Sequence, residues 1–219
     1  YEIHERLVGS EMCIRDSNFT QRYLYSAKLF GKGEVKRESS MDEAGQHSYS
    51  MSPTGKWAVH TFSNAVTPLV IDMVSFPGHK SVRMIEDNAE AKAQYQALGL
   101  RPKEFVKAKS GDLMLDVCMI KPANFDPNKK YPVIIEVYGE PAGSTVQDVW
   151  SGGDLWNQYM VNQGYIYVSI ENRGANAPRG REWRKCIYGE VGTFACEDQA
   201  RGIQDLALSL IHISEPTRR

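Results

Sequence analysis

The pattern of apolar and polar positions divides the chain into two halves. From residue 21 to about residue 87, short alternating runs are separated by turn residues, which is typical of half-buried strands joined by tight turns. Strands at this spacing predict a β-meander, such as the strands of a β-propeller blade. The predicted strands cover residues 23–29, 48–52, 56–60, 70–75 and 82–85, with turns at 31–33 and 53–55.

A helix is predicted between the two halves. Residues 89–98 are rich in Ala, Glu, Lys and Gln, which are good helix formers. Gly99 follows as a C-cap, and Pro102 prevents the helix from restarting. We interpret residues 89–103 as a linker helix.

The second half alternates between strands and helices. The strands are predicted at 104–109, 114–121, 131–138 and 165–170, and the helices at 155–162 and 196–206. The two later strands are of the buried type, rich in β-branched residues, and the order of elements predicts an α/β sheet with parallel strands. Glu197 and Asp198 would lie in the first turn of the last helix, where the helix dipole favours carboxylates. We therefore expect them to cap this helix.

Composition removes several classes of function. The formal net charge is −1, with 42% hydrophobic and 24% charged residues, which gives no electrostatic reason to expect nucleic acid or an anionic membrane as partner. No apolar run approaches the roughly 18 residues needed to span a bilayer. The cysteines at 13, 118, 186 and 196 lack the spacing of a metal site or disulfide framework, and Cys118 fits a buried position. We expect no metal or cofactor.

The two ends of the chain are related as nucleotide sequence. When residues 10–17 are back-translated and the reverse complement is read in a shifted frame, it encodes the Leu-Ser-Leu-Ile-His-Ile-Ser-Glu run at 208–215. Such an inverted repeat resembles the adapter that transposase-based library preparation attaches to DNA fragments. We therefore predict that residues 1–17 and 208–219 are adapter-like artefacts and exclude them from the fold. The interior is then a fragment cut without regard to domain boundaries.

Several short motifs of the interior occur in an order typical of one family. They are HSYSMSP at 47–53, KPANFDP at 121–127, KYPV at 130–133, VYG at 137–139 and NRG at 172–174. Together they resemble the prolyl oligopeptidase family of serine peptidases. GTF at 192–194, followed by EDQ at 197–199, points to its dipeptidyl peptidase IV branch.

This resemblance implies an α/β-hydrolase domain preceded by a β-propeller. It assigns residues 18–88 to the last propeller strands, 89–103 to the linker helix and 104–207 to the N-terminal part of a truncated hydrolase domain. It also implies removal of dipeptides from peptide amino termini, with proline or alanine in the second position. Peptide substrates, a homodimeric parent protein and a periplasmic, cell-envelope or secreted location belong to the same implication.

One catalytic group is implied within the chain. By the resemblance, Tyr138 is the side-chain donor of the oxyanion hole, where a phenol at the end of a buried strand can stabilise charge on the scissile carbonyl oxygen. Glu140 stands where many relatives carry a small residue, usually glycine. A carboxylate there would oppose the developing negative charge unless it points elsewhere, for instance toward a substrate amine. The sequence leaves these alternatives open.

The rest of the catalytic apparatus is not found. A serine nucleophile of this kind needs a Gly-x-Ser-x-Gly elbow followed by an acid and a histidine, and no such elbow occurs. Ser151 lacks the preceding glycine and is predicted to lie in a loop. His47, His60 and His79 lie in the first half and are expected to be exposed or structural. We therefore predict that this chain is catalytically inactive.

Two other classes of function compete with the peptidase. A nucleotide-binding protein would need a glycine-rich phosphate loop, and residues 174–180 fit neither of its common patterns. A non-enzymatic, protein-binding propeller with a degenerate hydrolase domain remains the alternative. The next stretch of the same gene would distinguish it from the peptidase.

Overall fold

The computed structural model describes residues 18–27, 35–141, 143–152, 154–209 and 212–213. The predicted turn at 31–33, the segment 1–17 and most of 208–219 lie outside these residues. The chain forms two compact units, residues 1–97 with 148–150, and residues 98–147 with 151–219. Each unit is described by itself.

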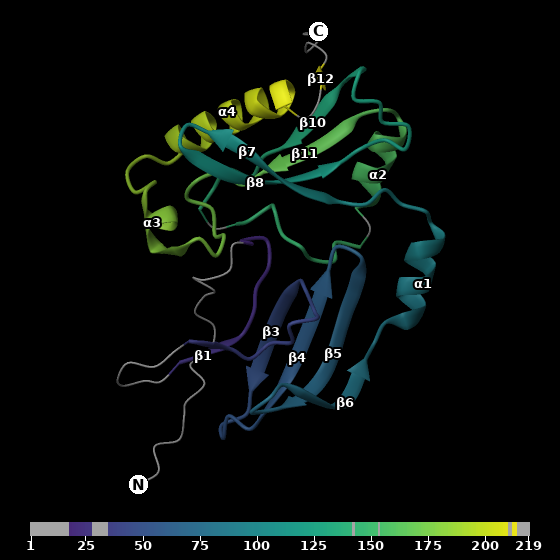
Figure 1. Ribbon diagram of the computed structural model, residues 1–219, viewed down its shortest axis with the longest axis vertical. Coiled ribbons are helices and arrows are strands. Elements are labelled where there is room, and N and C mark those ends of the chain that lie inside the picture. Colours follow the sequence, from purple (N-terminus) through teal and green to yellow (C-terminus); the bar gives the residue numbers. More distant parts are fainter. Residues whose placement is uncertain (1–17, 28–34, 142, 153, 210–211, 214–219) are drawn as a thin grey trace. The chain divides into compact units, whose positions relative to one another are not determined.

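The first unit contains an antiparallel four-stranded meander (Figure 1). Its strands follow one another in sequence order, so each pairs with the next along the chain. A short antiparallel pair precedes it, and the predicted meander is confirmed. The elements are β1 (Tyr25–Ser26), β2 (Lys36–Arg37), β3 (Gln46–Met51), β4 (Trp57–Asn64), β5 (Thr67–Ser75) and β6 (Lys80–Glu86), followed by α1 (Ala89–Ala97).

The second unit is built on a mixed four-stranded sheet in the order β10-β11-β8-β7. Strands β10 and β11 are parallel, as predicted, whereas β8 pairs antiparallel with both β11 and β7. The strands are β7 (Glu104–Ser110), β8 (Leu113–Ile120), β10 (Val133–Glu136) and β11 (Ile166–Ile170), with a small parallel pair of β9 (Lys130–Tyr131) and β12 (His212–Ile213) beside them. This is an α/β sheet.

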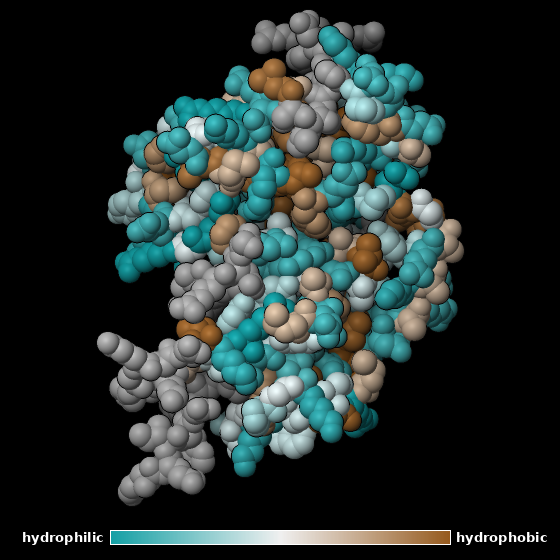
Figure 2. All heavy atoms as spheres, viewed as in Figure 1, coloured by the Kyte–Doolittle hydropathy of each residue, from teal (hydrophilic) through white to brown (hydrophobic). Residues whose placement is uncertain are grey.

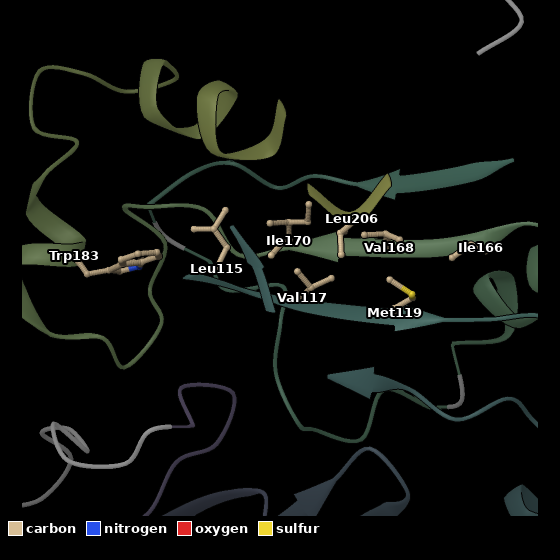
Figure 3. Close-up of a cluster of buried hydrophobic side chains, with 9 residues drawn as sticks. Leu115, Val117, Met119, Ile166, Val168, Ile170, Trp183 and Leu206 are labelled. Atoms are coloured by element: carbon tan, nitrogen blue, oxygen red, sulfur yellow. The ribbon is translucent and has the colours of Figure 1, made fainter. Parts of the chain in front are cut away.

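Helices cover both faces of this sheet. Helix α4 (Thr193–Ser209) packs against β7, and α2 (Leu155–Asn162) packs against β11 and β8. Alternate residues of β11 separate the two layers, because Ile166, Val168 and Ile170 pack with the α4 side while Tyr167 packs with Val161 of α2. Figure 3 shows the larger cluster between the sheet, α4 and Trp183. Its fully or almost fully buried residues are Ala108, Leu115, Val117, Met119, Ile166, Val168, Ile170, Trp183 and Leu206.

A glycine allows α4 to approach the sheet closely. A Cβ atom added to Gly202 would lie 3.0 Å from Ile170 Cδ1 and 3.5 Å from Leu115 Cδ1. Any larger residue would therefore push the helix away from its largest buried neighbours. The sequence pattern predicted the helix but not this contact.

Three sequence predictions differ from the structure. Helix α4 begins at Thr193, so Glu197 and Asp198 do not lie in its first turn, and the prediction that they cap the helix is wrong. The predicted buried strand at 131–138 is shorter and more exposed, with Val137 51% and Tyr138 52% exposed, because β10 pairs only with β11. Helix α3 (Gly180–Lys185) was not predicted, because six residues after a glycine and proline carry little periodic signal.

The surface carries both hydrophilic and apolar side chains. On the face drawn in Figure 2, teal hydrophilic residues predominate and brown hydrophobic ones lie between them. Every residue of β6 is exposed, including Val82, Met84 and Ile85. In the part of the chain that the structure describes, no helix has the length and apolar character to cross a membrane.

Candidate functional site

Tyr138 lies two residues after the end of β10 and lines a cavity of about 510 Å³ in the second unit. The cavity has two walls. One consists of residues 137–140, which continue from β10, and the other comes from α4 and the turn before it. The described residues of the second wall are Val191, Gly192, Ala195, Cys196 and Gln199. Tyr138 and Glu140, the two residues singled out in the sequence, therefore share one cavity.

A close backbone contact constrains the ring of Tyr138. A Cβ atom added to Gly143 would lie 2.7 Å from Tyr138 Cε1 and 2.9 Å from Cδ1, so the ring packs directly on the backbone at this position. The carbonyl oxygen of Gly143 accepts a hydrogen bond of 3.0 Å from the backbone N–H of Asn176. Any side chain at position 143 would displace the phenol ring.

The segment after Gly143 is fastened to a buried carboxylate. Glu171 follows β11 and is 3% exposed. It accepts hydrogen bonds from the Ser144 hydroxyl and from the backbone N–H of Val146, the latter at 3.2 Å. Burial raises the pKa of Glu171, and these hydrogen bonds oppose that shift. The end of β11 thus holds the segment on which Tyr138 rests.

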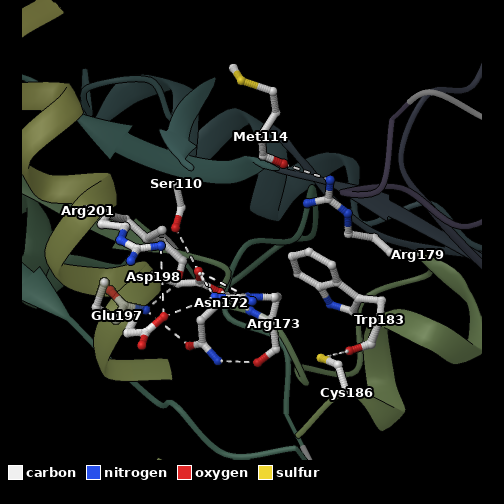
Figure 4. A network of polar contacts seen from close by, with 12 residues as sticks. Ser110, Met114, Asn172, Arg173, Arg179, Trp183, Cys186, Glu197, Asp198 and Arg201 are labelled. Carbon is white, nitrogen blue, oxygen red and sulfur yellow. Dashed lines mark hydrogen bonds and ion pairs between the residues drawn. The ribbon is translucent and has the colours of Figure 1, made fainter. Parts of the chain in front are cut away.

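A buried ion pair joins α4 to the loop after β11 (Figure 4). Asp198 is fully buried and accepts hydrogen bonds from the backbone N–H and Nε of Arg173, at 2.8 and 2.9 Å, and from the Ser110 hydroxyl at 2.8 Å. The Arg173 guanidinium also lies 4.3 Å from the ring centroid of Phe194. Hydrogen bonds to Asp198 raise the pKa of Arg173. The carboxylate expected to cap the helix is instead the centre of this network.

Gln199 connects the same network to the cavity wall. Its Nε2 donates to the carbonyl oxygen of Ile170 at 2.8 Å and to Asn172 Oδ1 at 3.1 Å. Asn172 in turn donates to the carbonyl oxygen of Arg173 at 2.8 Å. The position of this wall relative to β11 is therefore set by hydrogen bonds rather than by apolar packing alone.

A second buried carboxylate of this unit also forms ion pairs. Asp116 in β8 is 3% exposed and pairs with Lys107 and with Arg179, whose Nη1 lies 3.3 Å from Asp116 Oδ2. The Arg179 guanidinium lies 4.1 Å from the ring centroid of Trp183. Burial lowers the pKa of Arg179, while Asp116 opposes that shift. This group fixes the start of α3 against the sheet.

Known proteins resemble this chain in sequence and in structure. Residues 152–215 match the Prolyl oligopeptidase family. A crystal structure of dipeptidyl peptidase 4 from Porphyromonas gingivalis superposes with a TM-score of 0.76 and 30% identity, covering 88% of this chain and 27% of that one. The resemblance to prolyl oligopeptidase family peptidases is confirmed. The matched range includes residues 208–215, within the segment that the nucleotide repeat assigns to adapter; the adapter origin stays a prediction.

Further proteins are similar to this chain. A putative dipeptidyl aminopeptidase IV from Bacteroides ovatus superposes with a TM-score of 0.64 and 30% identity over 78% of this chain and 24% of that one. A probable dipeptidyl-aminopeptidase B from Ajellomyces capsulatus is 28% identical, covering 82% of this chain and 19% of its own length. The prolyl endopeptidase FAP of Bos taurus is 28% identical over 57% of this chain and 16% of its own. The chain thus spans about a fifth of the relatives' length.

The other candidates are not among the residues that line this cavity. Ser151 lies before α2, where its hydroxyl donates to Asp154 at 2.7 Å and accepts from Lys103 at 2.7 Å, so its predicted loop position is confirmed. His47 and His60 are buried in the first unit, where they have a structural role, and Cys118 is buried as predicted. Within the described residues, no group of three or more His, Cys, Asp or Glu side chains is arranged to hold a metal.

Sequence reasoning missed three residues of the site. Gly143 supports the Tyr138 ring, Glu171 holds the segment beyond it, and Gln199 lines the cavity. Only Glu171 had a local signal, because a carboxylate directly after a buried strand needs partners. The contacts of Gly143 and Gln199 join residues distant in sequence and have no signature in a single chain.

Proposed function

We propose that this chain is part of a serine-type dipeptidyl peptidase that removes X-Pro or X-Ala dipeptides from peptide amino termini. The observation that carries the proposal is the placement of Tyr138, which follows a parallel strand, rests on Gly143 and lines a cavity. The relatives' names support the reaction class.

In this proposal the Tyr138 hydroxyl donates to the oxyanion that forms when a serine attacks the scissile carbonyl. A donor already in place stabilises that charge without reorganisation, which contributes on the order of 10²–10³ in rate. Gly143, Ser144 and Glu171 act as positioning residues for the ring. We further propose residues 18–88 as the last propeller strands, 89–103 as linker and 104–207 as the first part of an α/β-hydrolase domain.

The chain as it stands is proposed to be inactive, because it contains no Gly-x-Ser-x-Gly elbow. Loss of the nucleophile from such a triad lowers kcat by about 10⁶. Incubation of this chain with an alanyl-proline p-nitroanilide should therefore release no p-nitroaniline above background. Turnover that scales with the chain's concentration and survives purification would contradict the proposed inactivity.

The decisive experiment uses the complete gene from which the chain derives. We expect a Gly-x-Ser-x-Gly elbow beyond residue 207, followed by an aspartate and a histidine, and hydrolysis of the same chromogenic substrate. The Tyr138→Phe variant of that protein should lose about 10²–10³ in kcat with little change in KM. Tyr159→Phe, on the exposed side of α2, is the matched control and should retain activity.

The alternative is a protein-binding propeller with a degenerate hydrolase domain. It predicts that the complete gene lacks the elbow or the downstream acid and histidine. It also predicts that Tyr138→Phe changes nothing measurable in that protein. Either result would overturn the peptidase assignment.

A further inference from the structure

The loop between β10 and α2 contributes residues to both compact units. The chain leaves the second unit after Gln147, adds residues 148–150 to the first unit and returns to the second unit at Ser151. The same loop contains Tyr138 and Gly143, on whose backbone the phenol ring rests. One loop therefore carries both the proposed oxyanion donor and a short segment of the first unit.

Asp148 fastens this segment within the first unit. Its Oδ1 accepts a hydrogen bond of 2.8 Å from the backbone N–H of Ala65, and its Oδ2 accepts one of 2.8 Å from Nε2 of Gln21. Its own backbone N–H donates to the carbonyl oxygen of Thr20 at 2.8 Å. Three hydrogen bonds to two separate stretches of the first unit thus hold one residue, and the charge of the carboxylate strengthens two of them.

Trp150 adds a second kind of contact to the same segment. Its ring centroid lies 4.3 Å from that of Tyr95 in α1, with an angle of 66° between the two ring planes. Its backbone N–H lies 3.5 Å from the Ser63 hydroxyl oxygen. Directed hydrogen bonds and ring packing therefore both tie residues 148–150 to the first unit.

A short, hydrogen-bonded stretch joins Asp148 to the support of the phenol ring. Val146, two residues before Asp148, donates its backbone N–H to the buried Glu171 carboxylate at 3.2 Å. Gln147 lies between them, and its Nε2 donates to the carbonyl oxygen of Ser144 at 2.7 Å. Because consecutive Cα atoms are held about 3.8 Å apart, so short a stretch has little slack to absorb a displacement of Asp148. Such a displacement therefore reaches the backbone on which the ring rests.

We propose that Asp148 is a positioning residue for Tyr138 and that Gln21 acts with it through the hydrogen bond to its carboxylate. The first unit then helps to set the oxyanion donor in place, although Tyr138 itself belongs to the second unit. A misplacement of about 1 Å in a catalytic group can cost about 10² in rate, so this fastening matters to the reaction. The inference rests on the proposed function for the role of the Tyr138 hydroxyl, whereas the dependence of the ring on Asp148 does not.

The test follows the Tyr138 ring by fluorine NMR in this chain, with its 11 tyrosines replaced by fluorotyrosine. The resonance that disappears in Tyr138→Phe belongs to Tyr138. We expect Asp148→Asn to shift this resonance by more than its line width, because one of the two acceptor oxygens of the carboxylate is lost. Gln21→Ala removes one hydrogen bond of a half-buried side chain and should shift it in the same direction. This second variant keeps the test available if Asp148→Asn does not fold.

Asp154→Asn is the matched control. Asp154 lies in the same loop, but its carboxylate pairs with Lys103 at 2.6 Å and accepts a hydrogen bond from the Ser151 hydroxyl, and both partners belong to the second unit. Its φ of 44° is one that asparagine adopts readily. The substitution removes the same charge and leaves the contacts of Asp148 in place, so the Tyr138 resonance should stay within its line width. Equal shifts in Asp154→Asn and Asp148→Asn would overturn the proposal.

A reversed hydrogen bond separates positioning from a general loss of stability. Asp148→Asn turns an amide donor toward the Gln21 amide, and the added change Gln21→Glu supplies an acceptor in its place. We expect this double variant to return the Tyr138 resonance to its position in the parent chain, whereas Gln21→Glu alone sets two carboxylates against each other and shifts it. A lower melting temperature of Asp148→Asn with an unmoved Tyr138 resonance would overturn the proposal. A double variant that shifts the resonance as far as Asp148→Asn would do the same.

The same variants of the complete protein report on catalysis. Asp148→Asn should lower kcat about tenfold with little change in KM, because the donor acts on the transition state, and the double variant should recover most of this loss. An unmoved Tyr138 resonance overturns the positioning role and leaves the peptidase proposal standing. A shifted resonance at unchanged kcat supports the dependence of the ring on Asp148 and counts against Tyr138 as the oxyanion donor.

Discussion

The two four-stranded sheets bury different kinds of side chain. The sheet β3–β6 buries a row of polar rings, in which His47 Nδ1 lies 2.9 Å from His60 Nε2 and His60 Nδ1 lies 2.8 Å from Asp72 Oδ1. The sheet of the second unit buries a cluster composed entirely of hydrophobic residues. One core depends on directional hydrogen bonds and the other on apolar area, which is nearly indifferent to orientation.

The polar contacts of the first core form a continuous chain. His47 Nε2 also lies 2.8 Å from the carbonyl oxygen of Glu43, so three hydrogen bonds run from Glu43 through both imidazoles to Asp72. Each of these contacts holds only while the two groups face one another in a suitable orientation.

The second unit nevertheless contains buried ion pairs, and loss of the pair between Arg173 and Asp198 should have the largest effect. Arg173→Met leaves the Asp198 carboxylate buried without its cation and should cost about 3–5 kcal/mol in the free energy of unfolding. Urea denaturation followed by circular dichroism measures it. Arg201→Met is the control, because Arg201 is half exposed and its contact with Glu197 is 3.9 Å; it should cost under about 1 kcal/mol. Equal losses would show that the buried pair has no special role.

Truncation of a core side chain should have the next largest effect. Leu115 is fully buried between β8 and α4, so Leu115→Ala should cost about 2–5 kcal/mol through lost burial and a residual cavity. Leu69→Ala, at a 43% exposed position of β5, should cost much less. Leu115→Ala should lower the urea concentration at the midpoint of unfolding, while the dependence of the free energy on urea concentration stays the same. A larger loss for Leu69→Ala would reverse the comparison of the two sheets.

The polar core should make the first unit sensitive to acid. Burial, together with the neighbouring His60, His79 and Arg37, lowers the pKa of His47 from its usual 6.5 to about 4, despite the opposing hydrogen bond to the Glu43 carbonyl. Between these values the unfolded chain binds a proton that the folded chain does not, so stability falls as the pH falls. The free energy of unfolding measured in urea should be lower at pH 4.5 than at pH 7 by about 1–3 kcal/mol because of His47.

The His47→Gln variant separates this effect from general acid sensitivity. It should be less stable at pH 7, because it loses the hydrogen bonds to His60 and Glu43, but its stability should depend less on pH between 4.5 and 7. Tyr49, which contacts His47 and His79, titrates only well above this window because burial raises its pKa. If the stability of His47→Gln depends on pH as strongly as that of the parent chain, another group is responsible for the pH dependence.

The smallest effect is expected on the outer strand of the first sheet. Val82 in β6 is 53% exposed, whereas Val74 in β5 is fully buried. Val82→Thr should change the free energy of unfolding by less than about 0.5 kcal/mol, while Val74→Thr should cost about 1–3 kcal/mol by burying a hydroxyl. Thermal melting of both variants distinguishes them. Similar losses would mean that β6 is buried in solution.

The elements were predictable where the local pattern was periodic. The meander at 46–86 and helix α1 follow from alternation and from strong helix formers, and the strand at 166–170 from its β-branched residues. The sequence pattern predicts that the last helix begins at Cys196, whereas α4 begins at Thr193. The partners of Asp198, which are Arg173 and Ser110, come from other elements. The exposure of β10 was not predicted because the sequence of a strand does not specify its position within a sheet.

The residues of the candidate site were also predictable only in part. Tyr138 and Glu140 were found through the order of short motifs, and the structure places both at one cavity. The contact of Gly143 with the Tyr138 ring and the place of Gln199 in the cavity wall could not be anticipated. Such contacts depend on distances between residues that packing brings together.

The sequence by itself determined the local structure, the family resemblance and the absence of a serine elbow, because these depend on neighbouring residues and their order. The tertiary structure decided which buried charges are paired, which strand lies at the edge of the sheet and which side chains share the cavity. Hydrogen bonds and packing act across space, so their partners are set only when the sheet order and helix positions are known. The charge at Glu140 was visible in the sequence, but its place at the cavity that Tyr138 lines was not.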